Sequence, residues 1–321
     1  MTALLAAALA LTLHAAAPRP PAADPVVTKY VPAGFCAALV IDPVRLDKAA
    51  TAAGLPVADL WKAVEEKAGL DPRKLHRATL FVDPLPGGNV AFFPAVAIRY
   101  PAGTDARKQL TPLLGGDAKE AKAGDQSYLR SGKYQLAKTE IAGYAADDRT
   151  LLFAPWPTLE TMLKAGDAKD RPLAAALAAA DLDHEMVLVI VPGPVMKKVA
   201  ELEKGSTNGT PALDPFRPAL KHLRAVVVTA DLGRETLVRA EFVADDAEGA
   251  AVVRATVEKL LARAKESYPA TRKGLETDLP ASVVTPLRAV LDAAVTGHKL
   301  TTDGAKVVLT VPRPKELAPK K

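Results

Sequence analysis

The segment Asp181–Glu185, with the sequence DLDHE, is the densest group of possible metal ligands in the chain. If the segment is extended, Asp181 and Asp183 point to one side and His184 to the other, because successive side chains alternate. No second group of ligands lies close in sequence, so a metal site here would need distant partners. We therefore interpret the segment as a polar linker that leads into a strand, and we predict no metal site.

The histidines and serines form no recognisable catalytic motif. The five histidines are His14, His76, His184, His222 and His298. None belongs to an HExxH or similar metal-binding motif. A serine hydrolase needs a positioned nucleophile, and the chain has no GxSxG motif. We therefore predict no catalytic residue.

Adjacent acidic residues occur at 147–148 and 245–246. Paired carboxylates that act as acid and base must converge in space, whereas neighbours in a strand diverge. We interpret the first pair as a turn and the second as the start of a helix. The segment GDAKEAKAGD, residues 116–125, is interpreted as a polar loop. The chain has neither a GxGxxG nor a GxxxxGK[ST] phosphate-binding loop, so we predict no cofactor.

Cys36 is the only cysteine, and it lies in the apolar segment FCAALVID, residues 35–42. Alternate residues of this segment form two faces, and both are apolar, as in a strand that is covered on both sides. A reactive thiol needs a cationic and partly exposed environment. The nearest cation in the sequence before it is Lys29. We predict a buried thiol; a disulfide between two chains is the alternative.

Composition places the chain among ordinary globular proteins. Hydrophobic residues make up 49%, charged residues 25% and aromatic residues only 5% of its 321 residues. A disordered chain is excluded, and few rings are available to stack on bases or sugars. The net charge of +5 is scattered along the sequence, so we predict no nucleic-acid partner. The basic end, residues 314–321, is expected to be a solvated tail, or else to touch an anionic polymer.

The N-terminus has the pattern of a secretory signal peptide. An uncharged apolar run from Ala3 to Leu13 is followed by three alanines and a proline-rich stretch. We expect residues 1–23 to be a signal peptide and leader, although no Lys or Arg precedes the apolar run. The run is shorter than the roughly 20 residues that span a bilayer, and we predict no transmembrane segment in the mature chain.

The remaining chain alternates between strand and helix patterns. The expected strands of the first half are 35–42, 75–83, 90–100, 134–141 and 143–155, and its expected helices are 43–53, 56–69, 105–114, 158–166 and 171–180. A similar order begins again near residue 185. Its expected strands are 185–191, 223–231, 235–244 and a hairpin around Asp303-Gly304, and its expected helices are 192–204, 213–222 and 245–268.

This repeated order predicts an internal duplication, with one unit at 26–182 and a second at 183–313. Asp83 and Asp231 end corresponding strands. The helix from residue 245 carries an apolar stripe that is expected to pack on the protein's own sheet, and Asp245 with Glu248 has capping-box spacing. We predict an α+β fold: two tandem units of antiparallel sheet, each with helices packed on one face.

The segments YVPAGFCAALVIDP and TTDGAKVVLTVPRP, together with the repeated strand–Asp–strand–helix order, resemble a loose group of exported, Ala-rich proteins of planctomycete-type bacteria. The resemblance implies duplicated α+β halves behind a signal peptide. Function is generally unassigned in that group, and the resemblance implies no functional residue.

We therefore expect an exported, periplasmic or extracellular protein that binds or assembles without catalysis. Its expected partner is a protein or polymer of the cell envelope, near Asp83 and Asp231 where the halves meet. Two alternatives remain: a carrier of an apolar ligand between sheet and helices, and an enzyme whose site is assembled from distant residues.

Overall fold

The structure is a computed structural model that describes residues 25–55, 57–83, 95–136, 138–167, 170–204, 211–278 and 281–317. The expected signal peptide, residues 1–23, lies outside the described residues, as does the end of the tail from residue 318.

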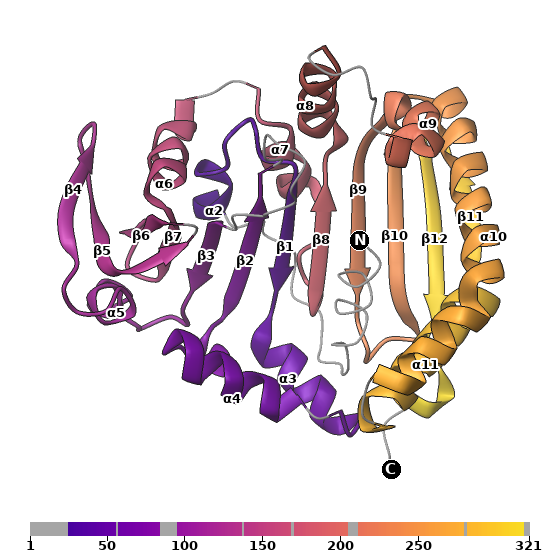
Figure 1. Cartoon of the computed structure of the whole chain (residues 1–321), viewed down its shortest axis with the longest axis horizontal. Coiled ribbons are helices and arrows are strands. Elements are labelled where there is room, and N and C mark those ends of the chain that lie inside the picture. Colours follow the sequence, from indigo (N-terminus) through magenta and orange to yellow (C-terminus); the bar gives the residue numbers. More distant parts are fainter. Residues whose placement is uncertain are drawn as a thin grey trace.

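The fold is α+β, as the sequence predicts, and its centre is an antiparallel sheet of 12 strands. The strands are β1 (Ala37–Ile41), β2 (Arg77–Val82), β3 (Ala95–Arg99), β4 (Lys119–Ala123), β5 (Gln126–Leu136), β6 (Thr139–Ala145), β7 (Thr150–Pro155), β8 (Met186–Ile190), β9 (Leu223–Ala230), β10 (Thr236–Ala244), β11 (Lys299–Asp303) and β12 (Lys306–Pro312). Their order across the sheet is β11-β12-β10-β9-β8-β1-β2-β3-β7-β6-β5-β4. Figure 1 shows β1 and β8 at the middle of this sheet.

The helices lie at the ends and on the faces of the sheet. They are α2 (Pro25–Lys29), α3 (Pro43–Ala52), α4 (Val57–Ala68), α5 (Arg107–Leu113), α6 (Trp156–Leu163), α7 (Pro172–Ala179), α8 (Pro192–Lys204), α9 (Arg217–His222), α10 (Ala247–Asp278) and α11 (Ala281–Thr296). Short 3-10 turns occur at Pro72–Lys74, Lys164–Asp167, Pro211–Phe216 and Lys315–Leu317. In Figure 1, α8 lies beyond one end of the central strands and α3 and α4 beyond the other.

The two halves of the chain join through β1 and β8. These strands pair antiparallel from Ala37 opposite Ile190 to Ile41 opposite Met186. Outward from this seam, the first half has the order β1-β2-β3-β7-β6 and the second has β8-β9-β10-β12-β11. The first half adds the hairpin of β4 and β5 at its edge. The matching order supports the predicted duplication, which we propose as the origin of the fold.

Each face of the sheet has its own helical cover. Val187 and Val189 of β8 pack with α7 in one cluster of buried residues, and we call this side of the sheet the α7 face. The opposite side carries Ile190 of β8, which is in register through β9 and β10 with Val307 of β12. Val307 packs with α10, and we call this side the α10 face. The apolar stripe of α10 therefore packs on the protein's own sheet, as the sequence predicts.

Some local predictions differ from the structure. Residues 134–141 were expected to form one strand, but the chain turns there between β5 and β6, and Lys138 has a φ of 67°. Residues 116–125 were expected to be a loop, but they contain the edge strand β4. An edge strand exposes one side, so polar residues fit it and the usual apolar alternation is missing.

The N-cap of α10 is Asp246 and not Asp245. The Oδ1 atom of Asp246 accepts a hydrogen bond of 2.7 Å from the backbone N–H of Gly249. The carboxylate of Asp245 lies 3.3 Å from Nδ1 of His222. The spacing to Glu248 predicted the right helix start to within one residue, but it assigned the cap to the wrong aspartate.

Candidate functional site

The segment Asp181–Glu185 leads directly into β8, at the seam between the halves of the sheet. The backbone N–H of Asp42, which follows β1, donates to the carbonyl oxygen of Glu185 at 2.9 Å. From the first half, Arg77 donates to the carbonyl oxygen of Leu182 at 3.3 Å. The polar linker that the sequence predicts therefore contacts elements of the first half on its way into the second.

Asp231, at the end of β9, is the buried partner of this segment. Its side chain is only 4% exposed. Its Oδ2 atom pairs with Nδ1 of His184, and its Oδ1 atom accepts the backbone N–H of Glu185 at 3.1 Å. Burial by itself raises the pKa of the Asp231 carboxyl. The hydrogen bond and charge of His184, the N–H of Glu185 and the charge of Arg234 together hold that pKa below its ordinary value.

The other groups of the segment are also engaged. Nε2 of His184 lies 3.5 Å from Oδ2 of Asp181, so each ring nitrogen faces a carboxylate. Oδ1 of Asp183 forms an ion pair of 2.5 Å with Nη1 of Arg45, which belongs to α3. Glu185 is 1% exposed, and its carboxylate accepts the backbone N–H of Leu232 at 3.2 Å.

These contacts form a closed polar network at the seam, and we call it the seam network. A general base needs a free lone pair toward its substrate, and both nitrogens of His184 already face carboxylates. Within the described ranges, no group of three or more His, Cys, Asp and Glu side chains could hold a metal ion. The arrangement orders the chain at the seam, which is a structural role.

The other histidines lie in separate parts of the fold. His76, just before β2, is exposed, and its backbone N–H donates to the carbonyl oxygen of Arg99 at 2.8 Å. His222 ends α9 beside Asp245. His298 lies between α11 and β11, where its Nδ1 is 2.9 Å from the carbonyl oxygen of Ala294. His14 falls outside the described residues.

Cys36 is buried, as the sequence predicts, with 6% of its surface exposed. Its thiol donates to the carbonyl oxygen of Val82 at 3.5 Å. Burial, with a smaller contribution from the negative charge of Asp83, raises the pKa of the Cys36 thiol to about 11. The thiol is therefore protonated at neutral pH and is a poor nucleophile.

Asp83 and Asp231 do not meet at a common groove, and this expectation was wrong. Each follows the corresponding strand, β2 or β9, but these two strands run in opposite directions. Val82 lies opposite Ala37 at one end of β1, and Ala230 lies at the end of Ile41. Because the halves join through an antiparallel pair, corresponding positions fall at opposite ends of the sheet.

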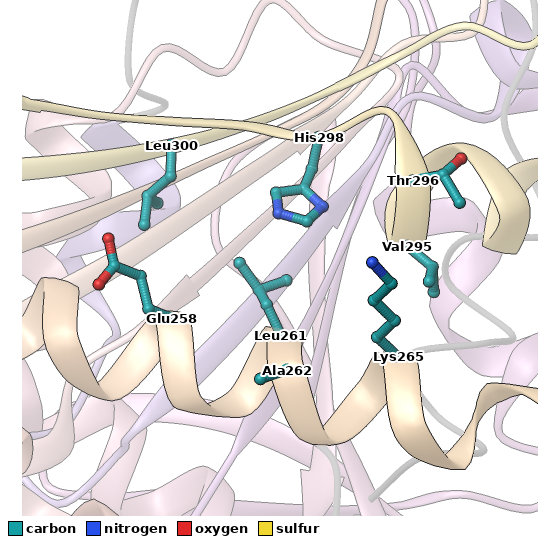
Figure 2. Close-up of a pocket in the computed structure, with 8 residues that line it drawn as sticks. All are labelled: Glu258, Leu261, Ala262, Lys265, Val295, Thr296, His298 and Leu300. Carbon is teal, nitrogen blue, oxygen red and sulfur yellow. The ribbon is translucent and has the colours of Figure 1, made fainter.

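A cavity of about 490 Å³ opens between α10, α11 and β11. Its lining residues are Glu258, Leu261, Ala262, Lys265, Val295, Thr296, His298 and Leu300. Figure 2 shows Leu261 pointing up from α10 toward the ring of His298, while Lys265 extends into the opening beside Val295. We call this cavity the α10–α11 pocket. Four of its eight lining residues are apolar and four are polar or charged.

This pocket was not predicted from the sequence, although part of the signal was available. Glu258, Leu261, Ala262 and Lys265 follow the spacing i, i+3, i+4 and i+7, which places them on one side of a helix. The other lining residues come from α11 and from the start of β11. Their arrival beside α10 is a result of tertiary packing, which no local pattern encodes.

Among the described helices, none combines the length and the apolar character needed to cross a membrane.

Comparisons with known proteins give a distant likeness in fold. No family model matches the sequence. No curated protein is significantly similar to it. Among solved structures, crystal form I of TP0453 is similar over 92% of this chain and 93% of its own, with a TM-score of 0.35 and 10% identity. Crystal form III of TP0453 is similar over 92% and 94%, with a TM-score of 0.37 and 10% identity.

Proposed function

We propose that the protein is an exported protein of the cell envelope that binds a ligand without catalysing a reaction. The α10–α11 pocket is the observation that carries this proposal. Its volume of about 490 Å³ falls in the range of about 300–1,000 Å³ that small-molecule sites occupy. This site, between sheet and helices, corresponds to a carrier of an apolar or partly apolar ligand.

The engagement of the seam network supports binding over catalysis. The side chains of Asp181, Asp183 and His184 are paired within the segment, with Arg45 or with Asp231. A reaction there would first require the network to open, which would break the buried contact between His184 and Asp231. Export is supported by the signal-peptide pattern of residues 1–23 and by the resemblance to exported, Ala-rich bacterial proteins.

The proposal can be tested by filling the pocket. Ala262 lines the pocket, and Ala264 is exposed on the same helix but does not line it. We expect the dye 8-anilinonaphthalene-1-sulfonate to increase its fluorescence on binding to the wild-type protein and to Ala264→Trp. Ala262→Trp should lose most of this increase, because an indole ring would occupy the space.

Both variants add the same ring to exposed positions of α10, so thermal unfolding should be similar for the two. Equal dye binding by Ala262→Trp and Ala264→Trp, with both proteins folded, would show that the pocket is not the binding site.

A further inference from the structure

The α10–α11 pocket has an apolar wall that is continuous with the protein core. Leu261 of α10 and Leu300 of β11 pack against the buried cluster that contains Val257 and Val307. Both leucines are half-buried, so part of each side chain remains at the pocket. Val295 of α11 adds a third apolar side chain. A ligand chain that covers these residues would remove apolar surface from water.

Of the two charged side chains that line the pocket, Glu258 is paired among the described residues and Lys265 is not. Glu258 is paired with Arg254 one helical turn away, with 2.9 Å between Oε1 and Nε. Arg254 also donates to the hydroxyl of Thr302 at 3.1 Å, which fixes its position beside Glu258. Lys265 has no ion pair with any residue in the described part of the chain. Its ammonium is therefore the uncompensated charge of the pocket.

The remaining polar groups are oriented by the protein itself. A carbonyl oxygen can only accept, so Nδ1 of His298 donates to the carbonyl of Ala294. In the neutral ring Nε2 is then an acceptor, so it cannot donate to an anion. The hydroxyl of Thr296 donates to the carbonyl of Asp292 at 2.7 Å. Figure 2 places Lys265, Thr296 and Val295 toward one end of the pocket, His298 at its middle above Leu261, and Leu300 and Glu258 at the other end.

A hydrogen bond ties the two helical walls of the pocket together. Tyr268, one turn beyond Lys265, donates its hydroxyl to Asp292 of α11 and ties the two helices together. The helix is thus fixed to α11 immediately after the pocket.

We infer that the α10–α11 pocket binds an amphiphile with a single anionic group, such as a carboxylate. The anionic group lies at Lys265, and the apolar chain covers Leu261, Val295 and Leu300. The inference rests on the proposed binding function and adds the charge and the polarity of the ligand.

The test uses three probes of equal chain length and different charge: octanoate, octan-1-ol and octyltrimethylammonium. Calorimetric titration compares wild type with Lys265→Met, which keeps an apolar stem and removes the charge. Lys259→Met is the matched control, because Lys259 is exposed on α10 and does not line the pocket. Circular dichroism and thermal unfolding verify that each variant is folded.

We expect octanoate to bind the wild type and Lys259→Met equally and to bind Lys265→Met roughly three- to tenfold more weakly. Octan-1-ol should bind all three proteins alike. Of the three probes, octyltrimethylammonium should bind the wild type most weakly. Octanoate binding that is unchanged in Lys265→Met, or reduced equally in Lys259→Met, would overturn the inference.

The same measurements distinguish a failure of the anionic preference from a failure of the proposed binding function. If octan-1-ol binds and Ala262→Trp abolishes that binding, but octanoate has no advantage, the binding function stands and the anionic preference is wrong. If none of the three probes binds the wild type, both are wrong.

Discussion

Asp83 and Asp231 occupy corresponding positions after β2 and β9, but their carboxyl groups are stabilised differently. Asp231 lies beside His184 and Arg234 and has a lowered pKa. Burial raises the pKa of Asp83, and the more distant charge of Lys198 offsets this only in part. No residue of the described part of the chain forms an ion pair with Asp83. An ionised aspartate at corresponding places in the two halves therefore has opposite effects on stability: it stabilises the fold at Asp231 and destabilises it at Asp83.

The lowered pKa of Asp231 predicts a loss of stability on substitution that depends on pH. Above the unfolded pKa of about 3.9 the ionised carboxylate stabilises the fold, and this contribution disappears as pH falls through the lower folded pKa. Asp231→Asn should therefore reduce the free energy of unfolding at pH 7 by roughly 2–4 kcal/mol. The difference from wild type should shrink below about pH 4. Urea unfolding over a pH series measures both values.

Asp83→Asn serves as the matched comparison, with the opposite sign. Because the folded pKa of Asp83 is raised, its ionised form is destabilising above that pKa, and the penalty is lost as pH falls through it. The amide should leave the free energy of unfolding at pH 7 equal to or above that of wild type. If both substitutions destabilise the protein equally at pH 7, the contrast between the two environments is wrong.

At the scale of elements, end contacts decide where strands and helices begin. The strand β8 begins after a segment that the seam network holds on both sides, and α10 begins at the side chain of Asp246. Neither start follows from hydrophobic periodicity alone. The capping of α10 is of special interest, because this helix forms one wall of the α10–α11 pocket.

The choice between two adjacent aspartates can be tested directly. Asp246→Ala should lower the free energy of unfolding by about 1 kcal/mol, because the backbone N–H of Gly249 would lose its acceptor. Asp245→Ala should cost less, since the carboxylate of Asp245 pairs with the half-exposed His222 and accepts the N–H of Asp246 in an exposed setting. Chemical unfolding of both variants decides the matter, and a larger loss for Asp245→Ala would restore the capping box that the sequence suggested.

At the scale of the whole molecule, two halves with the same strand order share one sheet. Their antiparallel junction keeps each face of the sheet continuous from one half to the other. The helices after β3 and after β10 therefore lie on the same α10 face, as the packing of α5 with Ile98 and of α10 with Val307 shows. The α10–α11 pocket lies in the second half, where α10 and α11 take the place of α5, β4 and β5.

Export of the chain remains a prediction, and it has a direct measurement. We expect N-terminal sequencing of the protein from its native source to begin between Ala15 and Ala23, because small residues follow an uncharged apolar run. A protein that retains Met1 and is recovered from the cytoplasm would contradict export. Dye binding by the α10–α11 pocket would be unaffected by that result.

The sequence alone determined the fold class, most element positions and the burial of Cys36. These features depend on short-range patterns: apolar alternation on both faces of β1, helical spacing in α10 and turn residues at Asp303-Gly304. The turn is confirmed by the pairing of Asp303 with Lys306 across the hairpin. The polar edge strand β4 escaped prediction because an exposed strand needs no apolar alternation.

Only the tertiary structure decided which distant residues meet. The pairing of His184 with Asp231 and of Asp183 with Arg45 depends on the antiparallel seam, which also separates Asp83 from Asp231. The α10–α11 pocket likewise depends on the packing of α11 beside α10, next to β11. Such contacts depend on the registers and packing directions of whole elements. The same local patterns are compatible with other arrangements of the strands and helices. The site therefore had to be found in the folded chain.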